Sequence, residues 1–297
     1  MRKLYQVLIT LSYVPERAME TNKTIKNHKL RSNYIRTIVQ SKKPLKPKIF
    51  LPSIPKIIIQ FWHDKNNIPL DVLKCLDSWN VLKHKSFKII LYDDNSARDY
   101  IQKNYPHDFL KAYNNCRHPA MRSDYFRLCY IYKSGGIYVD ADEIYNGNDL
   151  ETLLLDKSLK LQPLCYSAKS KSMIPFDSFV TNANYSDDWI FYINNNPIIA
   201  PPKHSLIYTA LKQATYNIAN SVFSSNDIQS ISGPGNLTSS FVELSIKNGD
   251  QDNDFVCFFN WELFSKCQWD LNYRKDERNW RRWKKMPNSK VFNNISD

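Results

Sequence analysis

The stretch that decides the fold of this chain is Tyr132-Lys133-Ser134-Gly135-Gly136-Ile137-Tyr138-Val139-Asp140-Ala141-Asp142. Apolar residues at helical spacing over 121–133 predict a helix, and the two glycines end it. The three apolar residues after the glycines predict a short buried strand. Two aspartates therefore follow a strand directly, at the carboxyl end where open α/β sheets place their ligands.

The residues upstream of this stretch predict a parallel sheet. The continuous apolar run Lys56–Trp62 is typical of a buried parallel strand, and Phe87–Tyr92 is a second such run. Between them, Pro69–Leu82 has apolar residues at helical spacing, so the region opens as strand, helix, strand. We therefore expect an α/β protein with a Rossmann-like mixed central sheet flanked by helices.

The second half of the chain carries weaker patterns. Asp188–Ile193, Pro197–Ala200 and Asp254–Phe259 predict short strands. His204–Asn220 predicts a helix, and the turn Ser232-Gly233-Pro234-Gly235 opens another helix.

Charge is unevenly distributed along the chain. Residues 1–56 carry 13 Lys/Arg and 2 Asp/Glu, residues 57–259 carry 19 and 22, and residues 260–297 carry 9 and 5. A slightly acidic body argues against a nucleic-acid partner. We divide the chain into a basic N-terminal arm, residues 1–50, with a helix near Leu30–Gln40, and one domain, residues 51–297. The arm could contact an anionic membrane peripherally, or it could be a solvated tail without a partner.

Composition also sets an expectation for location. No apolar run reaches the roughly 18 residues that span a bilayer. The six cysteines form no CxxC pair and no cluster with zinc spacing. Scattered thiols of this kind are typical of reduced, intracellular proteins. We expect a cytoplasmic protein, and the basic arm leaves peripheral attachment at the inner face of the membrane open.

Asp140 and Asp142 carry the chemistry that the sequence predicts. In a loop just past a strand, carboxylates at i and i+2 can converge on one ligand, whereas within the strand they would point to opposite faces. Carboxylate oxygens suit Mg²⁺ or Mn²⁺. Such a cation neutralises the charge that develops on a leaving nucleoside diphosphate. Because Asp-x-Asp pairs are common on surface loops, the neighbourhood decides the interpretation.

That neighbourhood resembles a known family. The sequence has Ser123-Asp124-Tyr125-Phe126-Arg127, then Gly135-Gly136-Ile137-Tyr138, then Asp140-Ala141-Asp142. This order resembles the sugar-binding, DXD-containing region of glycosyltransferase family 32, which includes initiating α-1,6-mannosyltransferases and bacterial polysaccharide glycosyltransferases. The resemblance covers roughly residues 54–245. It implies a fold of the GT-A type, the nucleotide-sugar-binding α/β fold of many glycosyltransferases.

The resemblance implies a donor-binding role for four residues. Trp62 would stack on the nucleotide base, with a place in the core as the alternative. Asp124 and Arg127, three apart on one helical face, would contact the donor sugar and its diphosphate. Their alternative is a local surface ion pair worth less than about 1 kcal/mol. Gly233 would let the backbone approach the donor closely, although it also suits an ordinary turn.

The aspartates and one C-terminal residue complete the implied site. Asp140 would contact the ribose or donor sugar and help to hold the cation, Asp142 would ligate the cation directly, and both are assigned as catalytic. Relatives place a His-Trp-like element at the C-terminal end of the site, but no histidine follows His204 here. Asn279 is the replacement metal ligand that we predict, and a basic residue on the diphosphate is the alternative.

We expect a metal-dependent, retaining hexosyltransferase that uses Mn²⁺ or Mg²⁺. It would move a sugar from a nucleotide-sugar donor to a glycan acceptor, such as a capsular or lipopolysaccharide-type surface polysaccharide. Two alternatives stay open: a toxin-like transferase of the same fold that modifies a protein, and a non-catalytic nucleotide-sugar-binding protein. The sequence does not distinguish GDP-mannose from the UDP-hexoses as donor.

Overall fold

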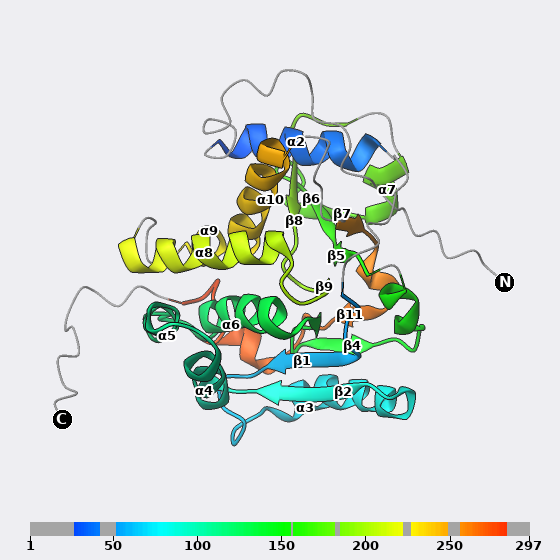
Figure 1. Ribbon diagram of the computed structural model, residues 1–297. Coiled ribbons are helices and arrows are strands. Elements are labelled where there is room, and N and C mark those ends of the chain that lie inside the picture. The colour runs from blue at the N-terminus through cyan, green and yellow to red at the C-terminus, as the bar shows by residue number, and fades with distance from the viewer. Residues whose placement is uncertain are drawn as a thin grey trace.

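The chain forms an α/β structure around a six-stranded mixed sheet (Figure 1). The computed structural model describes residues 27–41, 52–155, 157–181, 185–221, 227–248 and 256–283. The described helices are α2 (His28–Ser41), α3 (Leu70–Ser78), α4 (Asp94–Asn104), α5 (His107–Asn114), α6 (Pro119–Ser134), α7 (Phe176–Thr181), α8 (Ser205–Asn220), α9 (Ile228–Ile231) and α10 (Pro234–Asn248). Short 3₁₀ helices are η1 (Trp79–Lys85), η2 (Leu150–Leu154), η3 (Trp261–Leu263) and η4 (Asn272–Lys275).

The strands form three sheets. They are β1 (Ile57–Phe61), β2 (Lys88–Tyr92), β3 (Gly136–Tyr138), β4 (Glu143–Tyr145), β5 (Leu159–Leu161), β6 (Pro163–Ser167), β7 (Ser172–Ile174), β8 (Trp189–Ile193), β9 (Ile198–Ala200), β10 (Val256–Phe258) and β11 (Ser265–Cys267). The main sheet has the order β10-β5-β9-β3-β1-β2. In it β1 is parallel to β2 and β3, whereas β9 is antiparallel to β3 and β5. The prediction of an α/β fold with a mixed central sheet flanked by helices is confirmed.

The first strand and helices form where the sequence predicts them. The run Ile57–Phe61 is almost wholly buried, which its β-branched residues suit. Helix α6 starts with Pro119 at its first position, capped by the His118 side chain, which accepts from the backbone N–H of Ala120 at 3.0 Å. The expected second buried strand, β2, differs from the prediction because it is the edge of the sheet and only half-buried.

The two glycines between α6 and β3 are required by close backbone approach. Both have positive φ, +68° at Gly135 and +110° at Gly136. A Cβ on Gly135 would lie 2.7 Å from Cδ of Pro202, and one on Gly136 would lie 2.7 Å from the carbonyl oxygen of Ile57. Only glycine lets the chain leave helix α6 here and continue directly into β3, which pairs with β1.

The second half of the chain differs from the prediction in its strand pairing. Strand β8, expected at Asp188–Ile193, does not join the main sheet but forms a separate antiparallel sheet with β6 and β7. Strand β4 pairs antiparallel with β11, which follows it in the chain by more than 100 residues. The sequence analysis missed β4, β5, β6, β7 and β11, because runs of three to five residues carry little periodicity.

Helix α2 is a packed part of the body. Its buried side chains are Tyr34, Ile35, Ile38 and Val39, which belong to the largest hydrophobic cluster. Ser32 Oγ accepts a hydrogen bond of 2.9 Å from the backbone N–H of Phe191, at the open edge of β8. Figure 1 shows α2 lying across the top of the molecule, beside α10 and the β6–β8 sheet.

This packing bears on the basic N-terminal arm. The helix expected near Leu30–Gln40 is confirmed, but residues 28–41 are not separable from the body, because their apolar face is buried in it. Residues 1–26 and 42–51 lie outside the described part of the chain, so the boundary after residue 50 stays a prediction. No helix of the described residues is long and apolar enough to cross a membrane.

We expect Ile35→Ala to lower the stability of the whole domain. Ile35 is fully buried, and truncating such a side chain costs about 2–5 kcal/mol through lost burial and a residual cavity. Urea denaturation followed by tryptophan fluorescence measures the change. The matched control is Asn33→Ala on the exposed side of the same helix, which should shift the midpoint little. Equal midpoints for the two variants would contradict the packing of α2.

Candidate active site

The predicted donor residues follow two neighbouring strands. Strand β1 lies between β2 and β3, so the next two strands of this sheet in the chain lie on opposite sides of β1. Ligands of open α/β sheets bind at such a switch point, outside the carboxyl ends of the strands. Trp62 directly follows β1. Asp140 and Asp142 lie in the turn between β3 and β4. The turn is the setting that allows both carboxylates to face one ligand.

Arg127 joins the two predicted carboxylates of the donor sugar site. Its Nη2 lies 3.0 Å from Asp124 Oδ1 and 2.9 Å from Asp140 Oδ1. Its ring neighbour is Tyr138, with the guanidinium carbon 4.1 Å from the ring centroid. The side chain of Arg127 is only 4% exposed, so this is a buried network and not a surface ion pair. The alternative of a weak surface pair is therefore wrong.

Burial and charge set the protonation of this network. Burial raises the pKa of Asp124 to about 6, and the positive charge of Arg127 opposes that shift. Burial lowers the pKa of Arg127, but Asp140, Tyr138 and Asp124 together outweigh it, and the pKa lies above its ordinary value. Arg127 therefore stays charged beside the two carboxylates that it contacts.

Two asparagines after β8 complete the network, and the sequence analysis missed them. Asn195 donates from Nδ2 to Asp124 Oδ1 at 2.8 Å, and its carbonyl accepts from Arg127 Nη1 at 2.8 Å. Asn196 Oδ1 accepts from the backbone N–H of Asp140 at 2.9 Å. The available sequence pattern was the polar run Asn194-Asn195-Asn196-Pro197 after an apolar strand, which reads as an ordinary turn.

Glu143 is a second residue that the sequence analysis did not assign. It is 4% exposed and accepts from three side chains: Asn196 Nδ2 at 2.6 Å, Ser265 Oγ at 2.6 Å, and Trp261 Nε1. Burial raises its pKa to about 7, against the hydrogen bonds from Ser265 and Trp261. Glu143 accepts from Asn196, which in turn accepts from the backbone N–H of Asp140. Glu143 therefore helps to position the turn that carries Asp140 and Asp142.

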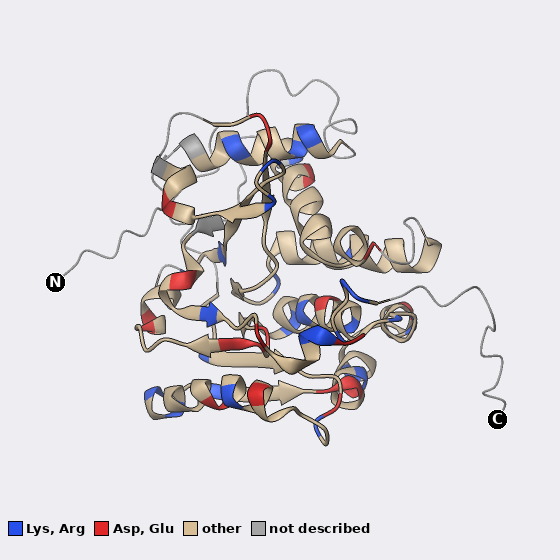
Figure 2. Cartoon of the chain, turned by 180° about the vertical axis from the view of Figure 1, so that it is seen from behind, with Lys and Arg blue, Asp and Glu red and all other residues tan. Residues whose placement is uncertain are grey.

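The C-terminal segment reaches Asp142. Asp142 Oδ2 accepts from Tyr273 Oη and from Arg274 Nη2, both in η4. The side chains of Asp142 and Arg274 are each 13% exposed. Burial raises the pKa of Asp142, the charge on Asp140 raises it further, and Arg274 opposes both. Figure 2 shows the acidic and basic segments that meet near the middle of the molecule.

Trp62 is packed beneath the same segment. The residue is 7% exposed and belongs to a hydrophobic cluster with residues of α3 and with Leu271. Tyr273 packs edge-on against it, with ring centroids 5.2 Å apart. Trp62 Nε1 lies 3.4 Å from the carbonyl oxygen of Asn67. The core alternative thus describes Trp62 in this structure, and stacking on a base stays a prediction that requires Tyr273 to move.

Gly233 lies beside the network of Asp124, Arg127 and Asp140. A Cβ at this position would be 3.0 Å from Asp124 Oδ2 and 3.1 Å from Cα of Gln229. A side chain here would press on the carboxylate of Asp124. The structure therefore brings Gly233 to the predicted site, at the start of α10.

The hydrogen bonds of the Asn279 side chain do not involve Asp140 or Asp142. Its Nδ2 donates to the carbonyl of Arg274 at 2.8 Å, and its Oδ1 accepts from the backbone N–H of Arg281 at 3.2 Å. Both bonds hold the local turn together. The residues of the C-terminal segment that contact Asp142 are Tyr273 and Arg274. A metal-ligand role for Asn279 stays a prediction.

The two aspartates fit a divalent cation whose other ligands would come from a bound phosphate group and water. No side chain of the described ranges donates to Asp140 Oδ2 or Asp142 Oδ1, so each carboxylate keeps one oxygen free for a metal. Those ranges contain no group of three or more His, Cys, Asp or Glu that could hold an ion alone. Two hard oxygens suit Mg²⁺ or Mn²⁺ when phosphate and water complete the shell.

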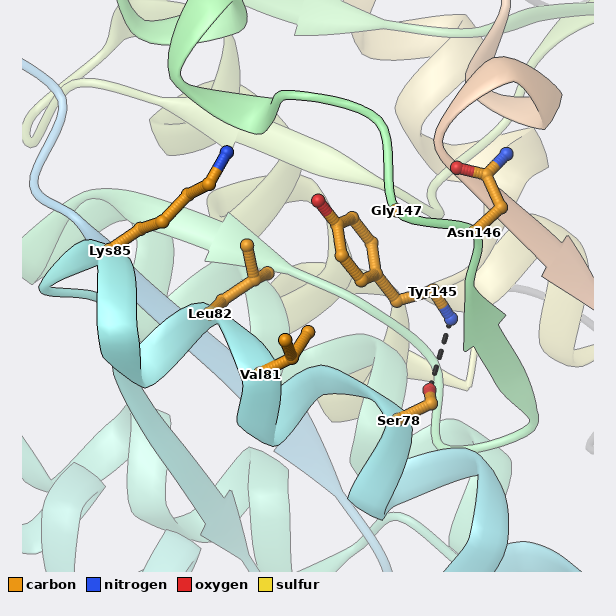
Figure 3. Close-up of a pocket in the computed structure, with 7 residues that line it drawn as sticks. All are labelled: Ser78, Val81, Leu82, Lys85, Tyr145, Asn146 and Gly147. Carbon is orange, nitrogen blue, oxygen red and sulfur yellow. Dashed lines mark hydrogen bonds between the residues drawn. The ribbon is translucent and has the colours of Figure 1, made fainter.

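A cavity of about 380 Å³ lies elsewhere, at the far end of β4. Figure 3 shows side chains of η1 on one side and the turn after β4 on the other, with the backbone N–H of Tyr145 donating to Ser78 Oγ. None of the residues assigned to the donor site lines it: Ser78, Val81, Leu82, Lys85, Tyr145, Asn146 and Gly147 do. The carboxylate cluster, not this cavity, is the candidate active site.

Comparison with known proteins assigns the region around the aspartates. Residues 69–159 match the family model described as glycosyltransferase sugar-binding region containing DXD motif. The matched residues include α6, the glycine pair and both aspartates. The resemblance predicted from the sequence is thereby confirmed for this region.

Fungal relatives match about a third of this chain. Inositol phosphoceramide mannosyltransferase 3 of Schizosaccharomyces pombe is 36% identical over 94 residues, which are 30% of this chain and 24% of that protein. Mannosyl phosphorylinositol ceramide synthase SUR1 of Saccharomyces cerevisiae is 35% identical over 104 residues, 34% of this chain and 24% of that protein. The chain thus spans about a quarter of the length of these relatives. Among solved structures, the PaToxG glycosyltransferase aligns with a TM-score of 0.43 and 15% identity, over 88% of this chain and 94% of that one.

We expect Glu143→Ala to destabilise the domain by at least about 2 kcal/mol. The substitution leaves the buried Asn196 Nδ2 and Trp261 Nε1 without this acceptor, whereas Ser265 Oγ keeps the carbonyl of Ile144; each unsatisfied group costs about 1–3 kcal/mol. Urea denaturation is the measurement. Glu151→Ala is the control, because Glu151 pairs with Lys56 at the surface and such a pair is worth less than about 1 kcal/mol. A loss no larger than that of the control would show that Glu143 does not hold the turn.

Proposed function

We propose that this chain is a metal-dependent, retaining hexosyltransferase that uses a nucleotide-sugar donor. The observation that carries the proposal is the buried network in which Arg127 joins Asp124 to Asp140, directly beside Asp142. It is supported by the match of residues 69–159 to a glycosyltransferase sugar-binding region. The GT-A type of fold that the family resemblance implies agrees with aspartates placed at the switch point of the sheet.

Each residue of the network has a task in the proposed reaction. Asp124 has an oxygen, Oδ2, that no described side chain bonds, and it can accept from a sugar hydroxyl. Arg127 orients the carboxylate of Asp140 through the contact of its Nη2 with Asp140 Oδ1. Asp140 and Asp142 would hold Mn²⁺ or Mg²⁺, which supplies charge neutralisation for the departing diphosphate. Asn195, Asn196 and Glu143 hold these groups in place, so that little reorganisation is needed when the donor binds.

Retention of configuration is the stereochemistry that we propose. In this course the acceptor hydroxyl attacks from the face that the leaving group vacates. The leaving phosphate accepts the proton of that hydroxyl, so no protein nucleophile is required.

Mannose is the donor sugar that we propose. The support comes from the two fungal relatives, whose names describe mannosyl transfer to inositol phosphoceramide. The proposed acceptor is a glycan or glycolipid hydroxyl, which covers both a surface polysaccharide and an inositol phosphate lipid. A cytoplasmic location, with peripheral membrane contact through the basic N-terminal residues, also belongs to this proposal.

A non-catalytic nucleotide-sugar-binding protein is the second candidate. The observation that favours it is the contact of Arg274 with Asp142, which places a cation of the chain against the proposed metal ligand. A binding protein of this kind would hold the donor without hydrolysing it.

We expect Asp142→Asn to abolish Mn²⁺-dependent hydrolysis of the nucleotide sugar while the chain stays folded. Loss of one cation ligand removes several kcal/mol of charge stabilisation, which is about 100-fold or more in rate. Release of nucleoside diphosphate from GDP-mannose and UDP-hexoses measures it. Asp108→Asn, an exposed aspartate of α5, is the control and should keep the wild-type rate. Wild-type turnover by Asp142→Asn would remove the metal assignment, and donor binding without any turnover by the wild type would favour the second candidate.

We expect GDP-mannose to be the preferred donor in the same panel. Transfer is then followed with labelled GDP-mannose and three acceptors: inositol phosphoceramide, an oligosaccharide, and a mixture of polypeptides. Label on the lipid or the oligosaccharide supports the proposed acceptor class. Label on polypeptide alone would instead establish the protein-modifying alternative, and faster hydrolysis of a UDP-hexose would overturn the choice of mannose.

A further inference from the structure

Arg274 occupies a position that the proposed reaction needs. Its Nη2 contacts Asp142 Oδ2, the carboxylate assigned to the cation. The neighbouring Tyr273 contacts the same oxygen and covers the ring of Trp62. The short helix η4 therefore sits on two of the predicted donor contacts at once.

The contact of Arg274 with Asp142 satisfies a charge requirement. A carboxylate with a side chain 13% exposed is costly to leave without a counter-charge. Asp124, Asp140 and Asp142 outnumber Arg127 and Arg274 by one, so the cluster is close to neutral as it stands. A divalent cation would make the cluster net positive, and a diphosphate would make it net negative again.

We propose that Arg274 is a diphosphate-binding residue that stands in on Asp142 for the divalent cation until the donor arrives. The inference rests on the proposed function of this site. When a cation takes Asp142, the guanidinium group next to it meets a like charge and must turn away. The nearest new anion is then the diphosphate that shares the cation, and a planar guanidinium group binds phosphate oxygens in pairs.

The contacts of Arg274 with Gln268 and Trp269 would hold the side chain near the site while the guanidinium group rotates away from Asp142. Its Nε donates to the carbonyl of Gln268 at 3.0 Å, and its guanidinium carbon lies 4.5 Å from the ring centroid of Trp269. These contacts hold the stem and one face of the group near the site. Movement of η4 would also uncover Trp62, because Tyr273 is the next residue in the chain.

The proposal predicts effects of opposite sign on two ligands. Without nucleotide, Arg274→Ala should bind Mn²⁺ about tenfold more tightly than the wild type, because the cation no longer displaces an ion pair. At saturating Mn²⁺, the same variant should bind GDP or UDP about tenfold more weakly, because a charged hydrogen-bond donor is lost. A purely structural role would leave both affinities unchanged or weaken both.

The measurements are free Mn²⁺ by electron paramagnetic resonance and nucleotide binding by calorimetry, on the full chain with its fold checked by circular dichroism. Arg274→Lys keeps the charge, so its Mn²⁺ affinity should stay near that of the wild type while its diphosphate binding falls. Arg278→Ala is the matched control, because Arg278 pairs with Asp276 in the same segment. It should leave both affinities unchanged.

The outcomes separate this inference from the proposed function. If the wild type binds Mn²⁺, Asp142→Asn does not, and Arg274→Ala matches the wild type for Mn²⁺ or for nucleotide, the role of Arg274 is overturned and the donor site stands. If neither the wild type nor Arg274→Ala binds Mn²⁺, the metal assignment fails and the inference fails with it. Binding of Mn²⁺ by Arg274→Ala alone supports the inference.

Discussion

A buried guanidinium group is the constraint on which the site depends. Arg127 lies inside the protein at 4% side-chain exposure, where an uncompensated charge would be costly. Two carboxylates and a backbone carbonyl surround it, from α6, from the end of β3 and from the segment after β8. Because each of these elements must supply its group in the right place, satisfying one charge sets the relative position of three parts of the chain.

Asp142 has the same requirement but meets it differently. Its counter-charge comes from Arg274, which lies 132 residues further along the chain in a short 3₁₀ helix. The Arg127 network is held by asparagine and glutamate side chains within the body, whereas Arg274 is anchored by its own segment and by an exposed tryptophan. In the proposed function, the Arg127 network would be the fixed half of the site, and the Arg274 segment would be the half that a ligand rearranges.

The parts predicted from sequence share a physical reason. Helix α6, the glycine turn and β1 are long or strongly patterned, so periodicity and backbone geometry identify them. The strands that were missed have three to five residues, and β11 pairs with a partner far away in the chain. Asn195, Asn196 and Glu143 were missed for another reason: a polar residue in a turn has many uses, and only its contacts show which one applies.

The sequence by itself determined that two aspartates follow a buried strand after a glycine pair, because apolar spacing and the need for positive φ are local properties. It also determined that Asp124 and Arg127 share a helical face. Only the tertiary structure decided that Arg127 is buried between both carboxylates, that Tyr273 covers Trp62, and that Arg274 reaches Asp142. These contacts join residues distant in the chain, and they depend on packing and charge balance that no local pattern contains.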